Sequence, residues 1–199
     1  MEKVLSITEE EIEKIGDAYA NYNYPSTDKG MFIFNDKNLL KKYIMGFARA
    51  CFKAGILYTT SNNHEGYIAV VSPADKISPM SGINLMVELI KAIGFKNFKT
   101  FIKFCQTGGE SIEDKMKKDK KKFVCIELLV VTEEYQGKGY MRKLMEFAFS
   151  KADEQNIPCI VDTDEGLKRD KYCHLGVHEV VRRDFGDNRY SYGMIREAV

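Results

Sequence analysis

The strongest constraint on the fold lies between residues 123 and 163, where two apolar runs flank an amphipathic segment. Phe123–Val131 is apolar at every position except Glu127, which is typical of a central strand buried on both faces. Thr132–Gly139 has the composition of a loop, and the apolar residues that follow recur at helical spacing to about Gln155. Pro158–Thr163 predicts a second buried strand. A strand–helix–strand unit of this kind requires two parallel strands joined by a right-handed crossover.

The flanking segments predict further helices and strands. Thr8 and Glu11 have the spacing of a capping box at the start of one helix, and Asp36 is placed to cap a second. Asn21–Gly30 between them is predicted to be a loop. Alternation and turn residues predict two hairpins. The first pairs Ile56–Thr60 with Tyr67–Val71, and the second pairs Val177–Arg183 with Tyr190–Arg196. A short helix is predicted over Leu167–His174. The whole pattern indicates a mixed α/β fold.

Residues 73–122 differ in character from the segments around them. Ile83–Ile93 and Phe95–Cys105 carry apolar stripes at helical spacing, and Gly108 with Gly109 ends the second. Glu113–Lys122 is dense in lysine, which favours a solvated helix face or a mobile surface segment over a nucleic-acid site. We therefore predict a helical insertion over 73–122, within a single domain that spans 1–199.

Composition excludes several classes of protein. The 199 residues carry a formal net charge of +1, which does not indicate a nucleic-acid binder. The five cysteines are widely scattered, so no metal site is expected and reduced thiols in a cytoplasmic protein are favoured. No apolar run is long enough to span a bilayer, and the N-terminal residues do not resemble a signal peptide. We expect a globular protein that binds neither nucleic acid nor membrane.

The loop between the two buried strands has the features of an anion site. Gly137 and Gly139 stand one residue apart immediately before a helix, where free backbone N–H groups and the helix dipole favour a phosphate or pyrophosphate. The alternative is a glycine-rich turn with no ligand. The Walker pattern is absent, and Arg142 occupies the position where a dinucleotide fingerprint requires Gly or Ala.

At this point the sequence resembles the GCN5-related N-acetyltransferase (GNAT) superfamily. The superfamily signature Gln/Arg-x-x-Gly-x-Gly/Ala, preceded by an apolar strand, is matched by Gln136 and Gly139 after Val131. Met141 departs from it where Gly or Ala is usual. A second stretch agrees at the usual spacing, with Asp162-Thr163 followed by Tyr172-Cys173-His174-Leu175-Gly176-Val177, although Lys168 stands where Asn is often found. The resemblance covers Tyr58–Val71 weakly and Phe123–Arg196 well.

The resemblance implies a fold and an activity. The fold would be a mixed, mostly antiparallel central sheet with splayed parallel strands, and acetyl-CoA would lie where Phe123–Val131 and Pro158–Thr163 separate. The pantetheine arm would pair with the backbone over Leu129, Val130 and Val131. The pyrophosphate would lie on a segment that we call the cradle, namely Gln136, Gly137, Lys138, Gly139, Tyr140, Met141 and Arg142. An amine would attack the thioester directly, and Tyr172 would be the general acid.

Individual residues also have simpler interpretations. Tyr172 could be a half-buried aromatic residue on a short helix, without a catalytic role. Glu127 alternates in phase with Cys125, Leu129 and Val131, which predicts that it faces the pantetheine. We assign it as the candidate general base; the alternatives are an ion-paired structural residue or a group that orients the acceptor. A covalent mechanism through a cysteine would need a base beside the thiol, and none is predicted.

Three functions remain open from the sequence. The leading hypothesis is an acetyl-CoA-dependent N-acetyltransferase that acts on a small-molecule or peptide amine, as a monomer or homodimer. The second is a non-catalytic acyl-CoA-binding or interaction module, and the third is an enzyme that uses the same loop for nucleotide phosphates. The 73–122 insertion is hypothesised to cap the acceptor pocket, and the acceptor itself is not identified.

Overall fold

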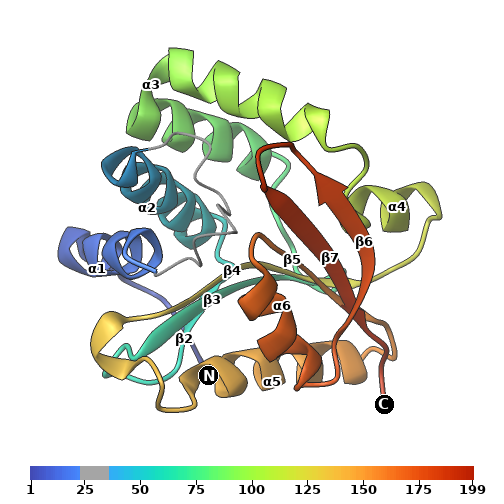
Figure 1. The fold of residues 1–199 in the computed structure, drawn as a ribbon. Coiled ribbons are helices and arrows are strands. Elements are labelled where there is room, and N and C mark those ends of the chain that lie inside the picture. Colours follow the sequence, from blue (N-terminus) through green and yellow to red (C-terminus); the bar gives the residue numbers. More distant parts are fainter. Residues whose placement is uncertain (23–35) are drawn as a thin grey trace.

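The computed structural model of the protein describes residues 1–22 and 36–199. Within these residues seven strands form one sheet in the order β1-β2-β3-β4-β5-β7-β6 (Figure 1). Only β4 and β5 pair in parallel. The strands are β1 Glu2–Lys3, β2 Leu57–Thr59, β3 Gly66–Val71, β4 Val124–Val131, β5 Cys159–Thr163, β6 His178–Asp184 and β7 Tyr190–Arg196. This confirms the mixed, mostly antiparallel sheet; β1 was not predicted.

Helices cover both faces of the sheet. Figure 1 shows α1, α2 and α3 on one side of the sheet and α5 and α6 on the other, with α4 beside β6. The helices are α1 Glu9–Ala20, α2 Lys37–Lys53, α3 Ser81–Thr107, α4 Ile112–Lys118, α5 Tyr140–Asp153 and α6 Gly166–Cys173. Part of the predicted loop Asn21–Gly30 falls on residues 23–35 and lies outside the described residues.

The predicted helix starts follow from local hydrogen bonds. Thr8 and Glu11 form the reciprocal capping box at the start of α1, and the Asp36 carboxylate accepts from the first backbone N–H groups of α2. Each cap satisfies donors that the helix itself leaves unpaired, which stabilises it by about 1 kcal/mol. Thus these two boundaries are set by short-range chemistry that the sequence displays.

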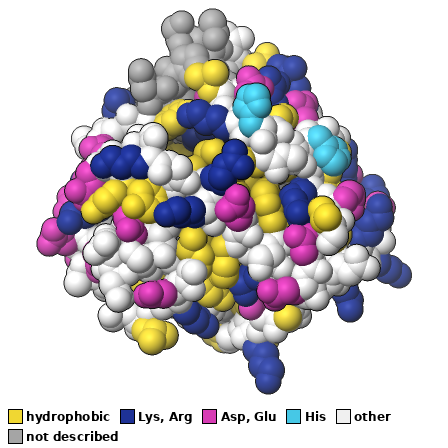
Figure 2. Space-filling view, turned by 90° about the horizontal axis from the view of Figure 1, so that it is seen from below, with side chains coloured by type: hydrophobic (Ala, Val, Ile, Leu, Met, Phe, Trp, Pro, Cys, Tyr) yellow, Lys and Arg dark blue, Asp and Glu magenta, His cyan; other side chains and the backbone are white. Residues whose placement is uncertain are grey.

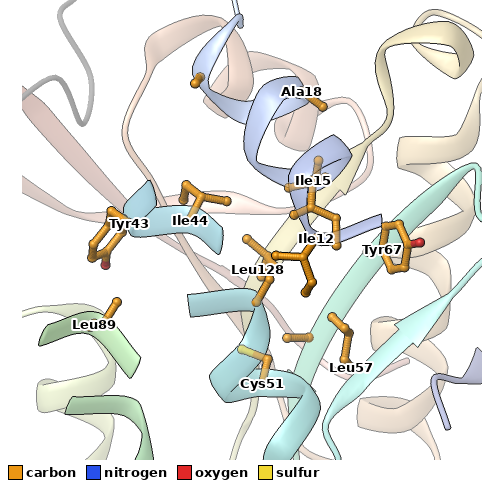
Figure 3. Packing of buried hydrophobic residues seen from close by; sticks show 14 of the residues in the cluster. Ile12, Ile15, Ala18, Tyr43, Ile44, Cys51, Leu57, Tyr67, Leu89 and Leu128 are labelled. Carbon is orange, nitrogen blue, oxygen red and sulfur yellow. The ribbon is translucent and has the colours of Figure 1, made fainter. Parts of the chain in front are cut away.

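The first apolar cluster packs α1 and α2 against β2, β3 and β4. Ile12 and Ile15 of α1 meet Leu57, Tyr67 and Leu128 from three strands, as Figure 3 shows. Five large side chains of this cluster are at most 1% exposed, so large-to-small substitutions among them would each cost about 2–5 kcal/mol. They are Ile12, Ile15, Leu40, Leu57 and Tyr67. The cluster holds one helical layer rigidly against the centre of the sheet.

The strand–helix–strand unit packs on the opposite face. Leu144, Met145 and Ala148 of α5 are fully buried against β3, β4 and β5. These residues are the stripe that the 3.6-residue period predicted. The loop before α5 contains a short 3₁₀ helix over Glu133–Tyr135 that was not predicted. The crossover therefore places the predicted anion loop at the end of the two parallel strands.

The 73–122 segment forms two helical elements between β3 and β4. The two predicted apolar stripes both lie in α3, which is interrupted at Gly94 by non-helical dihedral angles. Ile112 and Met116 of α4 are buried on the sheet, while Lys117 pairs with Glu113 on the solvated side. The lysine-rich run Glu113–Lys122 was predicted to be a solvated helix face or a mobile surface segment. Its first half lies in α4 and fits the solvated helix face. No described helix is both long enough and apolar enough to cross a bilayer.

Candidate active site

The two parallel strands separate part-way along their length. Pairing of β4 with β5 runs from Val124–Cys159 to Ile126–Val161 and then stops. Beyond that point, residues 127–131 of β4 have no strand partner on this edge among the described residues. The opening is the splay that the resemblance implied, and it leaves backbone groups available to an extended ligand.

A β-bulge at Glu127 lies where the strands part. β3 and β4 pair residue for residue from Gly66–Val131 to Ala69–Leu128, but the next pair is Val70–Ile126. Glu127 is therefore left without a partner in β3, and the alternation of side chains is interrupted at that residue. A bulge cannot be recognised from the apolar run that contains it.

The bulge changes which face Glu127 occupies. Leu129 and Val131 pack with the cluster beneath α5. Glu127 instead interacts with the charges of Glu113 and Lys117 on α4, across the sheet. The predicted phase, in which Glu127 shares a face with Leu129 and Val131, is therefore wrong because one extra residue in the strand reverses the alternation.

Electrostatics at the bulge make the Glu127 carboxylate a stronger proton acceptor than an exposed one. Burial raises the pKa of the Glu127 carboxyl, and the Glu113 carboxylate raises it further. The Cys125 thiol and the Lys117 ammonium act in the opposite direction without cancelling the increase. A carboxylate with a raised pKa is a better base toward an ammonium group than an exposed one.

The glycines of the cradle adopt the conformation that the loop requires. Gly137 has φ 75° and Gly139 has φ 84°, both in the left-handed region. A Cβ at either position would meet no atom within 4 Å, so backbone conformation rather than space selects glycine here. Gly139 is the N-cap of α5 and no side chain caps that helix. The first N–H groups of α5 are thus left for a ligand such as a pyrophosphate.

The other cradle residues support this assignment. The Gln136 side-chain amide donates to the Val131 carbonyl oxygen at 3.2 Å, which ties the loop back to β4. Met141, the departure from the superfamily signature, packs its side chain against the apolar cluster below α5. Lys138 and Arg142 are exposed. These residues fit a pyrophosphate, since the larger side chain at 141 points to the core while cations flank the loop.

Tyr172 lies on α6 at the splay. Its side chain is buried within the cluster that contains Val161, yet it lines the cavity described below. Its hydroxyl makes no hydrogen bond with any residue that the structure describes. Burial raises the pKa of Tyr172, and the Asp164 carboxylate raises it further, so the phenol stays protonated. A buried donor without a protein partner is available to a substrate atom.

Buried carboxylates beside Tyr172 were not predicted. Glu165 is completely buried, caps α6 through two backbone N–H groups, and accepts from the Tyr22 hydroxyl at 3.2 Å. Lys168, the second departure from the superfamily pattern, pairs with Asp164 at 2.8 Å. The lysine therefore has a structural role here, joining α6 to the end of β5. Their position directly after a buried strand was the only sequence signal for these acids.

A single cavity connects these parts. It has a volume of about 640 Å³ and passes through the gap between β4 and β5. The predicted pantetheine-binding residues of β4, most of the cradle and both candidate catalytic residues line this cavity. They are Leu129, Val130 and Val131, then Gln136, Gly137, Gly139, Tyr140, Met141 and Arg142, and finally Tyr172 and Glu127. Lys138 is the one predicted cradle residue outside this lining. Figure 2 shows Lys and Arg side chains around exposed hydrophobic ones near the middle of the α5 side, which suits an anionic ligand.

The cysteines near the site are poor nucleophiles. Burial raises the pKa of Cys159 to about 12 and raises that of Cys125 well above its usual value. Both groups are therefore thiols rather than thiolates at neutral pH. This disfavours an acyl-enzyme at Cys125 or Cys159.

Adding a methyl group at Gly139 tests the cradle. We expect Gly139→Ala to raise the Kd of coenzyme A about 5- to 30-fold, because the loop of the variant would relax and would have to return to the left-handed conformation on binding, at a cost of about 1–2 kcal/mol. Isothermal titration calorimetry measures the change. Gly82→Ala is the matched control, since its Cβ also meets open space but its φ is not positive. Equal affinity of the two variants would show that this backbone conformation does not matter for binding.

Comparisons with known proteins agree with this geometry. Residues 92–171 match the model of the acetyltransferase (GNAT) family. No curated protein matches the sequence. Among solved structures, PH1933 from Pyrococcus horikoshii OT3 is similar with a TM-score of 0.56 at 15% identity, covering 100% of this chain and 97% of that one.

Two insect enzymes are similar at the same level. The polyamine N-acetyltransferase of Drosophila melanogaster has a TM-score of 0.55 at 11% identity and covers 96% of each chain. Arylalkylamine N-acetyltransferase 2 of Aedes aegypti has a TM-score of 0.54 at 13% identity, covering 98% of this chain and 97% of that one. At such identities the likeness shows the fold alone. The family model matches residues 92–171, so this part of the chain is similar to the GNAT family of acetyltransferases.

Proposed function

We propose that this protein is an acetyl-CoA-dependent N-acetyltransferase that moves an acetyl group directly to an amine. The observation that carries the proposal is the single cavity that joins the cradle, the strand splay, Tyr172 and Glu127. A pyrophosphate on the cradle and a pantetheine arm along β4 would bring a thioester to the splay. There the thioester carbonyl would be reachable from the α4 side of the sheet, where Glu127 lies.

The proposed reaction conserves atoms and charge. Glu127 accepts a proton from the substrate ammonium, directly or through a water molecule. The neutral nitrogen attacks the thioester carbonyl carbon, so that a C–N bond forms and the C–S bond then breaks with its electron pair left on sulfur. Tyr172 donates its proton to the departing thiolate and is reprotonated by the second proton that the nitrogen loses. The products are an N-acetyl amide, coenzyme A and one proton.

The insertion is proposed to shape the acceptor side of the cavity. Phe104 and Cys105 at the end of α3 line it, opposite the cradle. Phe104 stacks on Phe185, from the turn between β6 and β7, with ring centroids 4.6 Å apart. These contacts support the hypothesis that the 73–122 segment caps the acceptor pocket. The amine acceptors named for the two insect enzymes also support an amine here.

The direct test is thiol release from acetyl-CoA with a panel of primary amines, with mass spectrometry of the N-acetyl product. We expect product formation that depends on both substrates. A non-catalytic binding module would instead bind acetyl-CoA, by calorimetry, without releasing thiol with any amine. Thermal stabilisation by ATP but not by coenzyme A would contradict the proposal and favour a nucleotide site.

A further inference from the structure

Part of the cavity lies on the face of the sheet that α2 and α3 cover, next to α4, and we call this part the chamber. Cys125, Ile160 and Val181 pack there with α4. Asp162 and Arg183 lie two residues further along β5 and β6, so their side chains point to the same face. Together with Glu127 on β4, they form the polar floor of the chamber, and all three line the cavity.

Aromatic rings form the walls of this chamber. Tyr43 and Phe47 of α2 stack with ring centroids 6.3 Å apart, and Phe104 of α3 stacks on Phe185 at an interplanar angle of 17°. All four rings line the cavity. Phe185 is held in place because it packs tightly against Gly108, where a Cβ would come within 2.3 Å of the ring. The walls are therefore apolar, planar and fixed, and suit a ring or another bulky apolar group.

The cation on the floor of the chamber, Arg183, already has protein partners. Arg183 lies 3.5 Å from Asp162, donates to Ser191 at 3.1 Å and stands over the Phe185 ring. Its Nε has no partner among the described residues, but that atom is sealed from solvent and out of reach of a ligand. On the α4 side, Lys117 pairs with Glu113. Within the described part of the chamber, no cation is left to receive a substrate carboxylate.

The negative charge is in excess. Asp162 pairs with one described cation, the Arg183 guanidinium, and its exposed side chain lines the cavity together with Glu127. No described cation on the floor forms an ion pair with Glu127. The cation that lowers its pKa is Lys117 on α4. A substrate ammonium would supply the missing charge between two carboxylates at the position where the strands part.

We propose that the chamber selects an arylalkyl primary monoamine, with Asp162 holding the ammonium group beside Glu127 and the four rings holding the aromatic body. This inference rests on the proposed acetyltransferase activity and names its acceptor. A free amino acid would place its carboxylate against Glu127 and Asp162. A polyamine would place its second ammonium group among the rings of α2 and α3, where the described residues offer no unpaired carboxylate.

The test compares acceptors that differ in one feature. We expect kcat/KM for 2-phenylethylamine to exceed that for L-phenylalanine about 100-fold, since a like charge at the floor costs several kcal/mol. It should also exceed the values for putrescine and ethylamine. A preference for L-phenylalanine or for putrescine, or equal values for all four, would overturn the proposal. Absence of thiol release with every amine, despite acetyl-CoA binding, would instead refute the acetyltransferase activity.

Two variants test which residues bind the amine acceptor. Asp162→Asn should raise the KM for 2-phenylethylamine about tenfold or more, because a charge-assisted contact is lost, while the KM for acetyl-CoA stays unchanged. Phe104→Ala should raise the KM for 2-phenylethylamine about fivefold and raise that for ethylamine by a smaller factor, because ethylamine has no ring to contact Phe104. Asp119→Asn and Phe95→Ala are the matched controls, both exposed and outside the cavity. Equal effects of variants and controls, in proteins with unchanged thermal unfolding, would contradict the assignment.

Discussion

Tyr172→Phe is expected to lower the kcat of amine acetylation by about 100-fold or more while leaving the Kd of acetyl-CoA within about twofold. The substitution removes one hydroxyl that lines the cavity and makes no hydrogen bond within the described chain. Burial raises the pKa of Tyr172, so the phenol is protonated throughout the working pH range. The same desolvated surroundings make a departing thiolate more basic and so better able to take the proton.

Steady-state thiol release and calorimetric titration with acetyl-CoA measure the two quantities. Tyr192→Phe is the matched control, because Tyr192 is buried in the same apolar cluster but does not line the cavity. A rate close to that of the unmodified enzyme would remove Tyr172 from the mechanism and revive its reading as a packed aromatic residue. A large loss of acetyl-CoA affinity would assign it to binding instead.

Glu127→Gln is expected to separate activity from stability. As the base, Glu127 works only when ionised, so kcat/KM should rise with pH through its raised pKa. In the variant this rise should be absent, and kcat/KM at neutral pH should fall about 100-fold. Glu113→Gln removes a carboxylate that raises the pKa of Glu127, so the rise should move to lower pH. An unchanged pH profile in both variants would exclude Glu127 as the base.

The thermal stability of Glu127→Gln should rise, although its activity falls. The folded-state pKa of Glu127 is raised above the value in an unfolded chain. Its contribution to folding is therefore complete below the unfolded pKa and is lost as pH rises through the folded pKa. Glutamine cannot ionise, so at neutral pH the variant does not bear the cost of a buried carboxylate and should be more stable. Its Tm should rise by about 2–4 °C for each kcal/mol gained in the free energy of unfolding. Calorimetric unfolding checks this, with exposed Glu10→Gln as control.

The strand–loop–helix that carries the cradle could be predicted because its signals are local. An apolar run, two glycines one residue apart and a helical stripe all lie within about thirty residues of sequence. Backbone conformation decides each of them, and Gly137 and Gly139 do adopt the positive φ that suits an anion loop. Tyr172 was connected to the cradle only by family resemblance, since α5 and β5 lie between them in the sequence.

The face of Glu127 could not be predicted, because the bulge depends on how β3 pairs with β4. Alternation along one strand assumes regular pairing, and the unmatched residue appears only when Val70 and Ile126 are seen to be partners. The surroundings of Lys168 could be predicted only in part. Its partner Asp164 is four residues away in the sequence, but the rings of Tyr19 and Tyr22 meet it only when the N-terminal residues pack near α6.

By itself the sequence determined the donor half of the proposed site, because a pyrophosphate would be bound by backbone groups whose geometry depends on the two glycines and on the start of α5. The tertiary structure alone decided the acceptor half. Asp162, Arg183, Phe104 and Phe185 come from four separate elements, and they line one chamber because β4 and β5 part at a bulge while α2 and α3 lie over the opening. Long-range packing sets such contacts, and no local pattern records them.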